Sequence, residues 1–379
     1  MLFEAFLIWT VFVYLVEIVN FRNVFGFVRN LEEITEQKYK SYNPLVSVII
    51  PFKGLDYELE KNIKSILSQN YKKREFIFVY DGVKDPVYKI LRKFKGKAKL
   101  IKSKHIKTCS GKVAALISGV EKSKGSVLVF GDSDIRPTKN WLAELIKPLS
   151  DKSIGVTTSY RLYFPIKNKF ISALKYTWDA SHIGLMISKY RFVWGGSFAL
   201  TRQNFDKLKI ISQWKTSISD DIVITKNMRK SGLDIRFSPK SIVATYEDTN
   251  WEELKEWSNR QMFFVKNYDK KTWKSAFYIY GYFNLVWLIG IVSMVIGIFT
   301  PIYLVFASFL LFTLVLIMIR DSMRESAIQK VLPEYREEFG KYKTKKILSS
   351  ILTKPLTMYN IFKVRKLDEI SWRGRKYSV

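Results

Sequence analysis

The amino-acid sequence predicts an α/β domain with a mostly parallel sheet, flanked on both sides by transmembrane helices. Two observations support this prediction. In the middle of the chain, short β-branched and aromatic runs alternate with segments of helical periodicity, which is the order of a doubly wound parallel sheet. Toward both ends of the chain lie apolar runs that are long enough to cross a bilayer.

The alternation starts with VSVII at 46–50, a β-branched run typical of a strand that is buried on both faces and that ends at Pro51. In such sheets, ligands bind beyond the carboxyl ends of the strands. Pro51, Asp81 and Asp132 follow three of the predicted strands, so we expect them to border one crevice. The other strands are expected at 75–80, 98–101 and 126–131, and the helices at 59–67, after Asp85-Pro86 and at 112–120.

The first apolar run covers residues 2–24 and is expected to be an uncleaved membrane anchor. Glu4 and Glu17 lie toward its ends, where water is within reach. The run lacks the basic start and the small-residue cleavage site of a signal peptide. A buried core helix is the alternative interpretation.

A second apolar region predicts a helical hairpin, because two apolar runs are separated only by Thr300-Pro301 and closed by Arg320. The regions on both sides of this hairpin are rich in Lys and Arg, and the positive-inside bias places both in the cytoplasm. We therefore expect a multi-pass protein of the cell membrane. Its predicted parts are an anchor (1–25), a cytoplasmic domain (26–270), the hairpin (275–320) and a basic cytoplasmic tail (321–379).

The tail contains one more apolar segment, 347–362, which Lys354 and Pro355 interrupt. Basic residues on both sides of this segment favour an interfacial helix that binds anionic headgroups. A solvated basic tail is the alternative.

The chain is strongly basic, with 63 Lys and Arg residues against 34 Asp and Glu and a formal net charge of +29. This balance suits an acidic membrane surface or a phosphorylated substrate. Nucleic acid is not expected as a partner, because the sequence has no zinc spacing, recognition helix or RNA-binding aromatic signature. The single cysteine, Cys109, excludes an internal disulfide, and with only two histidines a multi-histidine metal site is not expected.

Two carboxylates stand one residue apart in the segment GDSDIRP, where a strand ends. Residues i and i+2 of an extended segment point to the same side, so Asp132 and Asp134 can be directed at one point. This arrangement favours a hard divalent cation, Mg²⁺ or Mn²⁺, which completes its shell with substrate phosphates. Alternatively, Arg136 neutralises one carboxylate and the other caps a helix near Pro137.

Five segments follow one another in the order and spacing of family 2 glycosyltransferases, which have the GT-A fold, a Rossmann-like and mostly parallel sheet. The sequence is most similar to ceramide glucosyltransferases and related membrane lipid glycosyltransferases. The resemblance covers about residues 45–267. The segments are VSVIIPFKGLDYELEKNIKSILSQNY, VYDGVKDP, GKVAAL, GDSDIRP and SISDDIVITKNMRKSGLDIRFSP.

The resemblance implies a binding site for a nucleotide-sugar donor. Asp81 matches the aspartate that binds the nucleobase, and Lys53 and Asp56, after Pro51, match the segment beside the donor pocket. The alternatives are a turn aspartate before Gly82 for Asp81 and ordinary surface positions for Lys53 and Asp56.

The resemblance also implies a site for the donor diphosphate. Lys112 matches a lysine near the donor phosphates, and its alternative is a solvated helix charge. Asp132 and Asp134 match the metal and diphosphate site, with Asp134 as the more direct metal ligand.

On the acceptor side, Asp221 matches the catalytic base. Asp220 is adjacent, and we expect one of the two to cap a helix while the other faces the cleft, so that swapped roles stay open. The acceptor-side turn is matched by Trp194, Gly195 and Gly196, and a Ser-His pair near the acceptor path is matched by His182. Core packing for Trp194 and a structural role for His182 are the alternatives.

One departure concerns the Gln/Arg-x-x-Arg-Trp motif with which the family ends its catalytic domain. Arg260 matches the first position, but Phe263 and Phe264 replace the Arg-Trp pair. This puts in doubt how acceptor and diphosphate are held. Possible substitutes for the missing arginine are Arg229, Arg236 and Lys266.

These observations together predict a membrane-bound inverting glycosyltransferase. It is expected to transfer a glucose-like sugar from a UDP-linked donor to a lipid acceptor at the cytoplasmic membrane face. The alternatives are a processive polysaccharide synthase and a catalytically impaired relative that acts as a scaffold.

Overall fold

The computed structural model describes residues 2–372 and 374–378 of the chain. It divides into two compact units, and each is described by itself. The sheet unit comprises Leu31–Phe164 and His182–Glu247, and the helical unit comprises Met1–Asn30, Pro165–Ser181 and Asp248–Val379.

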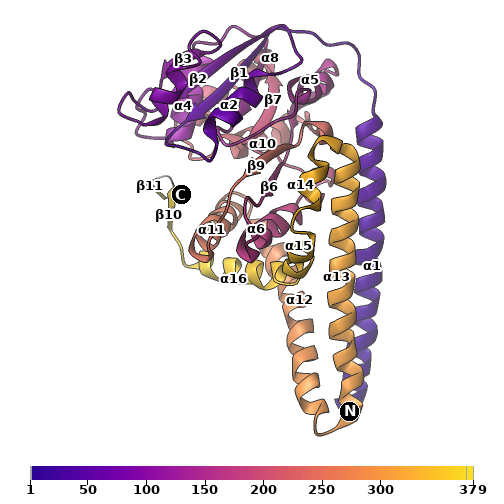
Figure 1. The fold of residues 1–379 in the computed structure, drawn as a ribbon. Helices are drawn as coiled ribbons and strands as arrows, with labels where there is room; N and C mark the ends of the chain where they lie inside the picture. Colours follow the sequence, from indigo (N-terminus) through magenta and orange to yellow (C-terminus); the bar gives the residue numbers. More distant parts are fainter. Residues whose placement is uncertain (1, 373, 379) are drawn as a thin grey trace. The chain divides into compact units, whose positions relative to one another are not determined.

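A seven-stranded sheet in the order β3-β2-β1-β4-β7-β5-β8 forms the centre of the sheet unit (Figure 1). The pairs β1–β2, β2–β3, β1–β4 and β5–β8 are parallel, and only β7 runs antiparallel to its neighbours in this sheet. A smaller parallel pair joins β6 to β9. The strands are β1 (Val46–Phe52), β2 (Arg74–Tyr80), β3 (Lys99–Lys102), β4 (Val127–Gly131), β5 (Ile154–Thr158), β6 (Arg161–Phe164), β7 (Ser197–Thr201), β8 (Asp234–Phe237) and β9 (Val243–Tyr246).

Helices pack on both faces of this sheet, because its strands alternate their side chains between two apolar clusters. In β1, Val48 and Ile50 belong to one cluster and Ile49 to the other. The predicted α/β class and mostly parallel sheet are therefore confirmed. The helices are α2 (Leu59–Leu67), α3 (Val87–Arg92), α4 (Gly111–Val120), α5 (Trp141–Ile146), η1 (Lys147–Ser150), α7 (Gly184–Ile187), α8 (Arg202–Lys207), α9 (Ile210–Trp214), α10 (Asp220–Ser231) and η2 (Pro239–Ser241).

The prediction that Pro51 ends the first strand is wrong. Strand β1 continues to Phe52, and Pro51 stays in register with Val79 of β2. A proline donates no backbone hydrogen bond, but the neighbouring residues keep the parallel ladder intact here. The crevice residues therefore start after Phe52.

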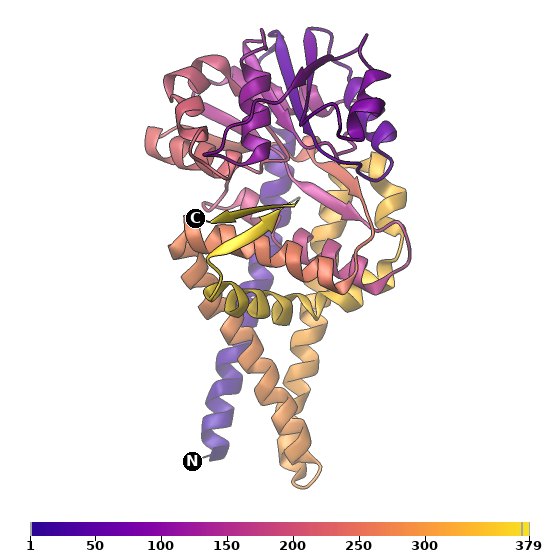
Figure 2. The same cartoon turned by 90° about the vertical axis from the view of Figure 1, so that its left-hand side faces the viewer.

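Three helices among the described residues are long and apolar enough to cross a membrane: Leu7–Glu36, Lys270–Gly297 and Pro301–Val331. The first lies in α1 (Leu2–Glu36), which extends beyond the predicted apolar run. The other two are α12 (Lys270–Gly297) and α13 (Leu304–Val331), which form the predicted hairpin around η3 (Pro301–Tyr303) (Figure 2).

Two buried contacts hold these helices together. Val13 of α1 packs in one apolar cluster with Val286 of α12 and Ile317 of α13. The carboxylate of Glu17 accepts a hydrogen bond from Arg320 at 2.7 Å, and both side chains are buried. A pair of this kind satisfies charges that would be costly alone in an apolar environment.

The remaining helical unit consists of shorter helices and one β-hairpin. The apolar segment 347–362 is interrupted at a different position from the one predicted, because the chain turns at 351–352. Lys354 and Pro355 lie in the first turn of α16, where proline is tolerated. The elements are α6 (Phe170–Ala180), α11 (Trp251–Tyr268), η4 (Pro333–Tyr335), α14 (Arg336–Gly340), α15 (Lys343–Ser350), α16 (Thr353–Arg365), β10 (Glu369–Trp372) and β11 (Arg375–Ser378).

Candidate active site

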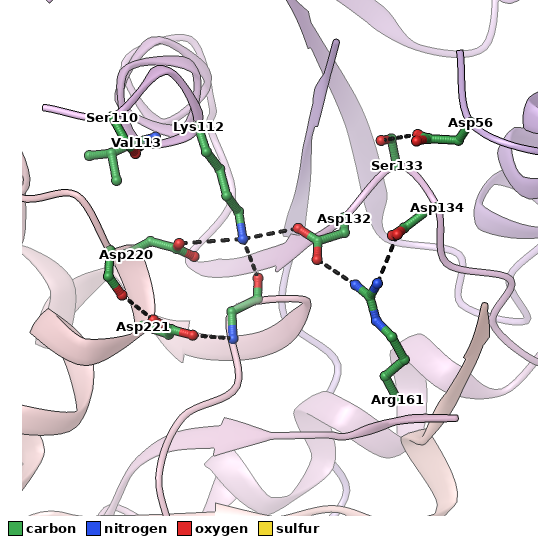
Figure 3. A network of polar contacts seen from close by, with 12 residues as sticks. Asp56, Ser110, Lys112, Val113, Asp132, Ser133, Asp134, Arg161, Asp220 and Asp221 are labelled. Carbon is green, nitrogen blue, oxygen red and sulfur yellow. Dashed lines mark hydrogen bonds and ion pairs between the residues drawn. The ribbon is translucent and has the colours of Figure 1, made fainter. Parts of the chain in front are cut away.

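A network of charged side chains lies at the carboxyl end of β4 (Figure 3). We call it the carboxylate network, and every member belongs to the sheet unit. It contains four carboxylates and two cations that come from the turn after β4, the N-termini of α4 and α10, and the start of β6. Its members are Lys112, Asp132, Asp134, Arg161, Asp220 and Asp221.

Lys112 joins the two halves of the network. It is the second residue of α4, whose N-cap Ser110 accepts a hydrogen bond from Val113 and so fixes where the helix starts. Its Nζ lies 2.9 Å from Asp132 Oδ1 and 3.3 Å from Asp220 Oδ1, and donates to the Gly195 carbonyl at 3.0 Å. The alternative interpretation of Lys112 as a solvated charge on a helix is therefore wrong.

Arg161, the first residue of β6, bridges Asp132 and Asp134. Its Nη2 donates to Asp132 Oδ2 at 2.5 Å and its Nη1 to Asp134 Oδ2 at 2.7 Å. The two carboxylates thus converge as the i, i+2 spacing predicts, and a guanidinium holds them together.

The contacts of Arg136 differ from the alternative predicted for this motif. Its Nη2 donates to Glu58 Oε2 at 3.0 Å and its Nε to Asn62 Oδ1 at 3.1 Å. No helix begins at Pro137, since α5 starts only at Trp141. The N–H of Arg136 donates to the carbonyl of Ala244.

Residues Asp132 and Asp134 fit a divalent cation only in part. Asp134 Oδ1 is buried and has no hydrogen-bond partner in the part of the chain that the structure describes. Oxygen ligands of this kind suit Mg²⁺ or Mn²⁺. However, no group of three His, Cys, Asp or Glu side chains among the described residues is placed to hold a metal ion. A cation here would need donor phosphates as further ligands.

Asp220 and Asp221 begin α10 but differ in their contacts. Asp221 Oδ1 accepts the N–H of Ile222 at 2.8 Å, and its Oδ2 accepts the N–H of Gly195 at 2.8 Å. Ser219, the N-cap, also donates to Asp221. Asp220 is buried against Lys112, and its Oδ2 has no hydrogen-bond partner among the described residues. The expectation that one aspartate caps the helix is met by Asp221, while Asp220 is buried and makes no capping contact.

The protonation of the network follows from burial and crowding of charge. Burial raises the pKa of Asp220 to about 7, helped by the carboxylates of Asp221 and Asp132 and opposed by Lys112. Burial alone would lower the pKa of Lys112, but the carboxylates of Asp132, Asp220 and Asp221 outweigh it and raise this pKa. Lys112 therefore remains charged at neutral pH, while Asp220 is poised between its two states.

The turn before β7 carries the predicted acceptor-side residues. The ring of Trp194 lies 4.8 Å below the Arg161 guanidinium and 6.1 Å from the ring of Tyr160. A Cβ on Gly196 would stand 2.0 Å from the Trp194 ring, so only glycine lets the ring fold back over the turn. A Cβ on Gly195 would likewise meet Asp221 Oδ2 at 2.8 Å. Trp194 thus lies against Arg161 of the network and also packs against the apolar core, as its alternative predicts.

The predicted donor-pocket residues lie after β1 and β2. Lys53 Nζ is 3.6 Å from Asp81 Oδ2, and both side chains are 36% exposed, so these two strand ends meet. Asp56 accepts a hydrogen bond from Ser133 Oγ at 2.5 Å. Ser133 stands between the two bridged aspartates, so the segment after β1 reaches the carboxylate network.

Two other predicted residues belong to elements other than those of this network. His182 is in the turn before α7, where its carbonyl accepts from the N–H of Leu185. Arg260 lies on α11 in the helical unit. Phe263, also on α11, is fully buried in an apolar cluster with Ile361 and Val364 of α16. An arginine would be costly at that buried position, which accounts for the departure from the family motif.

Sequence reasoning missed Arg161. The residue stands in the short run RLYF, whose four residues are all buried in the structure. A charged residue that opens an aromatic and apolar strand is seldom buried without a partner. That pattern was the available signal, although it does not name the partner.

Comparison with known proteins places these features in a family. The family model described as Glycosyl transferase family 21 matches residues 8–379. The sequence motifs alone had indicated glycosyltransferase family 2. An uncharacterized glycosyltransferase of Haemophilus influenzae is 35% identical over 91 residues, 24% of this chain and 36% of that protein. Glycosyltransferase AglE of Haloferax volcanii is 29% identical over 115 residues, 30% of this chain and 38% of that protein. The chain thus spans little more than a third of these relatives.

Among solved structures, mannosyltransferase PcManGT from Pyrobaculum calidifontis, in complex with GDP-Man and Mn²⁺, aligns with a TM-score of 0.46. The identity is 14%, and the alignment covers 90% of this chain and 96% of that chain. An overlap at this level is too low to support an inference about function. The family model, in contrast, spans nearly the whole sequence, and on that ground the chain belongs to glycosyl transferase family 21.

Proposed function

We propose that the protein is a membrane-bound inverting glycosyltransferase that moves a glucose-like sugar from a UDP-linked donor to a lipid acceptor. The observation that carries this proposal is the contact of Lys112 with both Asp132 and Asp220. One ammonium thereby joins the segment proposed to bind the donor diphosphate to the segment proposed to supply the base. A transferase needs these two functions within reach of one sugar carbon.

On the donor side, Asp81 is the proposed partner of the nucleobase, because its exposed carboxylate can accept the N3–H of uracil. Lys53 stands beside it at 3.6 Å and can approach the donor. Lys112 supplies a charged ammonium for the phosphates. Asp134, with its unpartnered Oδ1, and Asp132 would hold Mg²⁺ or Mn²⁺. Such a cation, when bound, offsets the negative charge that develops on the leaving diphosphate.

On the acceptor side, Asp221 is the proposed base, which takes the proton of the acceptor hydroxyl as the hydroxyl attacks the anomeric carbon. Asp220 has a pKa near neutrality, but only 5% of its side chain is exposed. A base must first reach the proton that it removes. Asp221 is partly exposed and lies against the Gly195 turn, so access favours it.

A lipid acceptor is supported by the three apolar helices, which can place the chain at a bilayer. The similarity to ceramide glucosyltransferases in the motif segments favours a lipid that presents a hydroxyl as the acceptor group. The basic character of the chain favours the cytoplasmic side, where Lys and Arg accumulate and the leaflet is anionic.

The test is the mass of the product formed from labelled UDP-glucose by the full chain in native membranes, with a lipid extract added. We expect one hexose added to a lipid, and no product from the Asp221→Asn variant. A polymeric product would show a processive polysaccharide synthase instead. A well-folded protein that labels neither lipid nor polymer with any of several UDP-sugars would contradict the proposal and favour a scaffold.

A further inference from the structure

Arg161 occupies the place between Asp132 and Asp134 to which a divalent cation is expected to bind. Its two terminal nitrogens contact Oδ2 of both carboxylates, at 2.5 and 2.7 Å. Paired contacts between a guanidinium and carboxylates are strong and well oriented. Any cation that binds these aspartates must therefore compete with a charge that the chain itself supplies.

The surroundings of Arg161 keep the guanidinium in this position. Its side chain is only 7% exposed and lies close to two aromatic rings, with centroids 4.8 Å away in Trp194 and 5.1 Å away in Tyr163. The hydroxyl of Tyr163 accepts a further hydrogen bond from Nη1 at 3.1 Å. A cation over an aromatic face is favoured electrostatically. Nε, however, is buried and has no hydrogen-bond partner among the described residues.

The second carboxylate oxygen of Asp134, Oδ1, is available to a cation. Asp134 Oδ1 is buried without a hydrogen-bond partner, on the same carboxylate whose Oδ2 Arg161 holds. A cation at Oδ1 would lie only a few ångströms from the guanidinium, and the two like charges would repel each other. Metal and Arg161 therefore oppose each other at this carboxylate, and a further negative charge would relieve that repulsion.

We propose that Arg161 is an internal counter-ion that competes with the divalent cation, so that metal binds tightly only together with a nucleoside diphosphate. Without the donor, the guanidinium compensates Asp132 and Asp134. With the donor, the diphosphate supplies negative charge for both cations. Because coupling between two ligands is reciprocal, the metal strengthens nucleotide binding by the same factor. This inference rests on the proposed function only for the chemical class of the anion.

The test measures Mn²⁺ affinity directly, from the electron paramagnetic resonance signal of free Mn²⁺, on the full chain in detergent with and without saturating UDP. For the wild type we expect UDP to tighten Mn²⁺ binding by about 5- to 150-fold, the usual range of coupling between sites. In Arg161→Gln, Mn²⁺ without UDP should bind at least about tenfold more tightly than in the wild type, and the effect of UDP should shrink.

Two control variants separate charge from general disturbance. Arg136→Gln makes the same change in a neighbouring arginine that pairs with Glu58, and should leave Mn²⁺ affinity within about twofold. Arg161→Lys keeps the charge and should behave like the wild type within about threefold. If Arg161→Gln does not fold, Arg161→Met removes the same charge with a side chain of similar length and is measured in the same way, because UDP coupling in the wild type alone would also follow from direct binding of Mn²⁺ to the phosphates.

The proposal is overturned if Arg161→Gln binds Mn²⁺ no more tightly than the wild type, if UDP leaves the wild-type affinity unchanged, or if no Mn²⁺ binds under either condition. None of these results depends on sugar transfer. An enzyme that makes the expected lipid product without such coupling would retain the proposed function and lose only this inference.

Discussion

Two sets of buried ion pairs in this molecule contrast in how their charges are matched. Two buried pairs of the helical unit each join one cation to one carboxylate: Arg320 to Glu17 at 2.7 Å, and Lys346 to Glu325 at 2.5 Å. In the sheet unit the carboxylate network has four carboxylates for two cations, and Glu247 adds to the negative potential around Arg161. A matched ion pair can be purely structural. A surplus of carboxylates over cations, in contrast, favours the binding of a positively charged ligand.

Two buried lysines show the same difference. Burial lowers the pKa of Lys346, and the carboxylates of Glu325 and Glu338 do not make up for it. Lys112 is subject to the same effect of burial, yet its pKa is raised because Asp132, Asp220 and Asp221 all lie near it. The closer gathering of carboxylates, and not burial as such, therefore separates Lys112 from Lys346.

The largest expected effect comes from removing one carboxylate of the unmatched set. Asp221→Asn keeps the size and polarity of the side chain but removes the proposed proton acceptor. Transfer should fall by roughly 10²- to 10⁴-fold, the usual contribution of a general base, while nucleotide affinity stays nearly unchanged. Turnover and nucleotide binding of the purified variant check this.

Asp220→Asn is the matched comparison, because it changes the neighbouring carboxylate in the same way. We expect a smaller loss of turnover, accompanied by weaker nucleotide binding, since Lys112 loses one partner. If Asp220→Asn stops turnover in a folded protein while Asp221→Asn stays active, the base has been assigned to the wrong residue.

The matched pair in the helical unit should respond in stability and not in chemistry. Arg320→Met leaves the buried carboxylate of Glu17 without its cation and should cost about 3–5 kcal/mol, as for other broken buried pairs. Thermal unfolding measures this loss, and turnover per folded molecule should stay near that of the wild type. The double variant Glu17→Gln with Arg320→Met should recover most of the stability. Failure to recover would show that the pair is not a simple structural match.

The pKa of Asp220 gives a smaller, pH-dependent effect. Its folded value of about 7 lies above the ordinary value near 3.9, so the folded protein binds this proton more tightly than the unfolded chain. That stabilisation is complete below about pH 4 and is lost as pH rises through 7. Between pH 5 and pH 8 the wild type should lose about 2–3 kcal/mol relative to Asp220→Asn. Parallel melting curves of the two proteins over this range would contradict the raised pKa.

Much of the fold follows from sequence patterns with a simple physical basis. Parallel strands give continuous apolar runs, and their carboxyl ends meet, which is why the predicted neighbourhood of Lys112, Asp132 and Asp220-Asp221 exists. The three apolar helices were predictable because the bilayer sets their length.

Contacts between segments far apart in the sequence were not predictable in the same way. Arg161 reaches Asp132 and Asp134 from a strand 27 residues beyond Asp134. Arg136 is nearer in the sequence, but its side chain donates to Glu58. The spacing of residues in the sequence predicts the face of a helix or strand on which a side chain lies. It does not predict which distant residue a side chain in a turn will contact.

The most direct test of the account is the metal dependence of transfer from UDP-glucose. The unmatched carboxylates are expected to need a divalent cation together with the donor, so excess EDTA should abolish transfer and added Mn²⁺ or Mg²⁺ should restore it. Asp134→Asn, which changes the aspartate with the unpartnered oxygen, should remain inactive after the metal is restored, although the protein stays folded. Full activity of the wild type in excess EDTA, or normal activity of Asp134→Asn, would contradict the account.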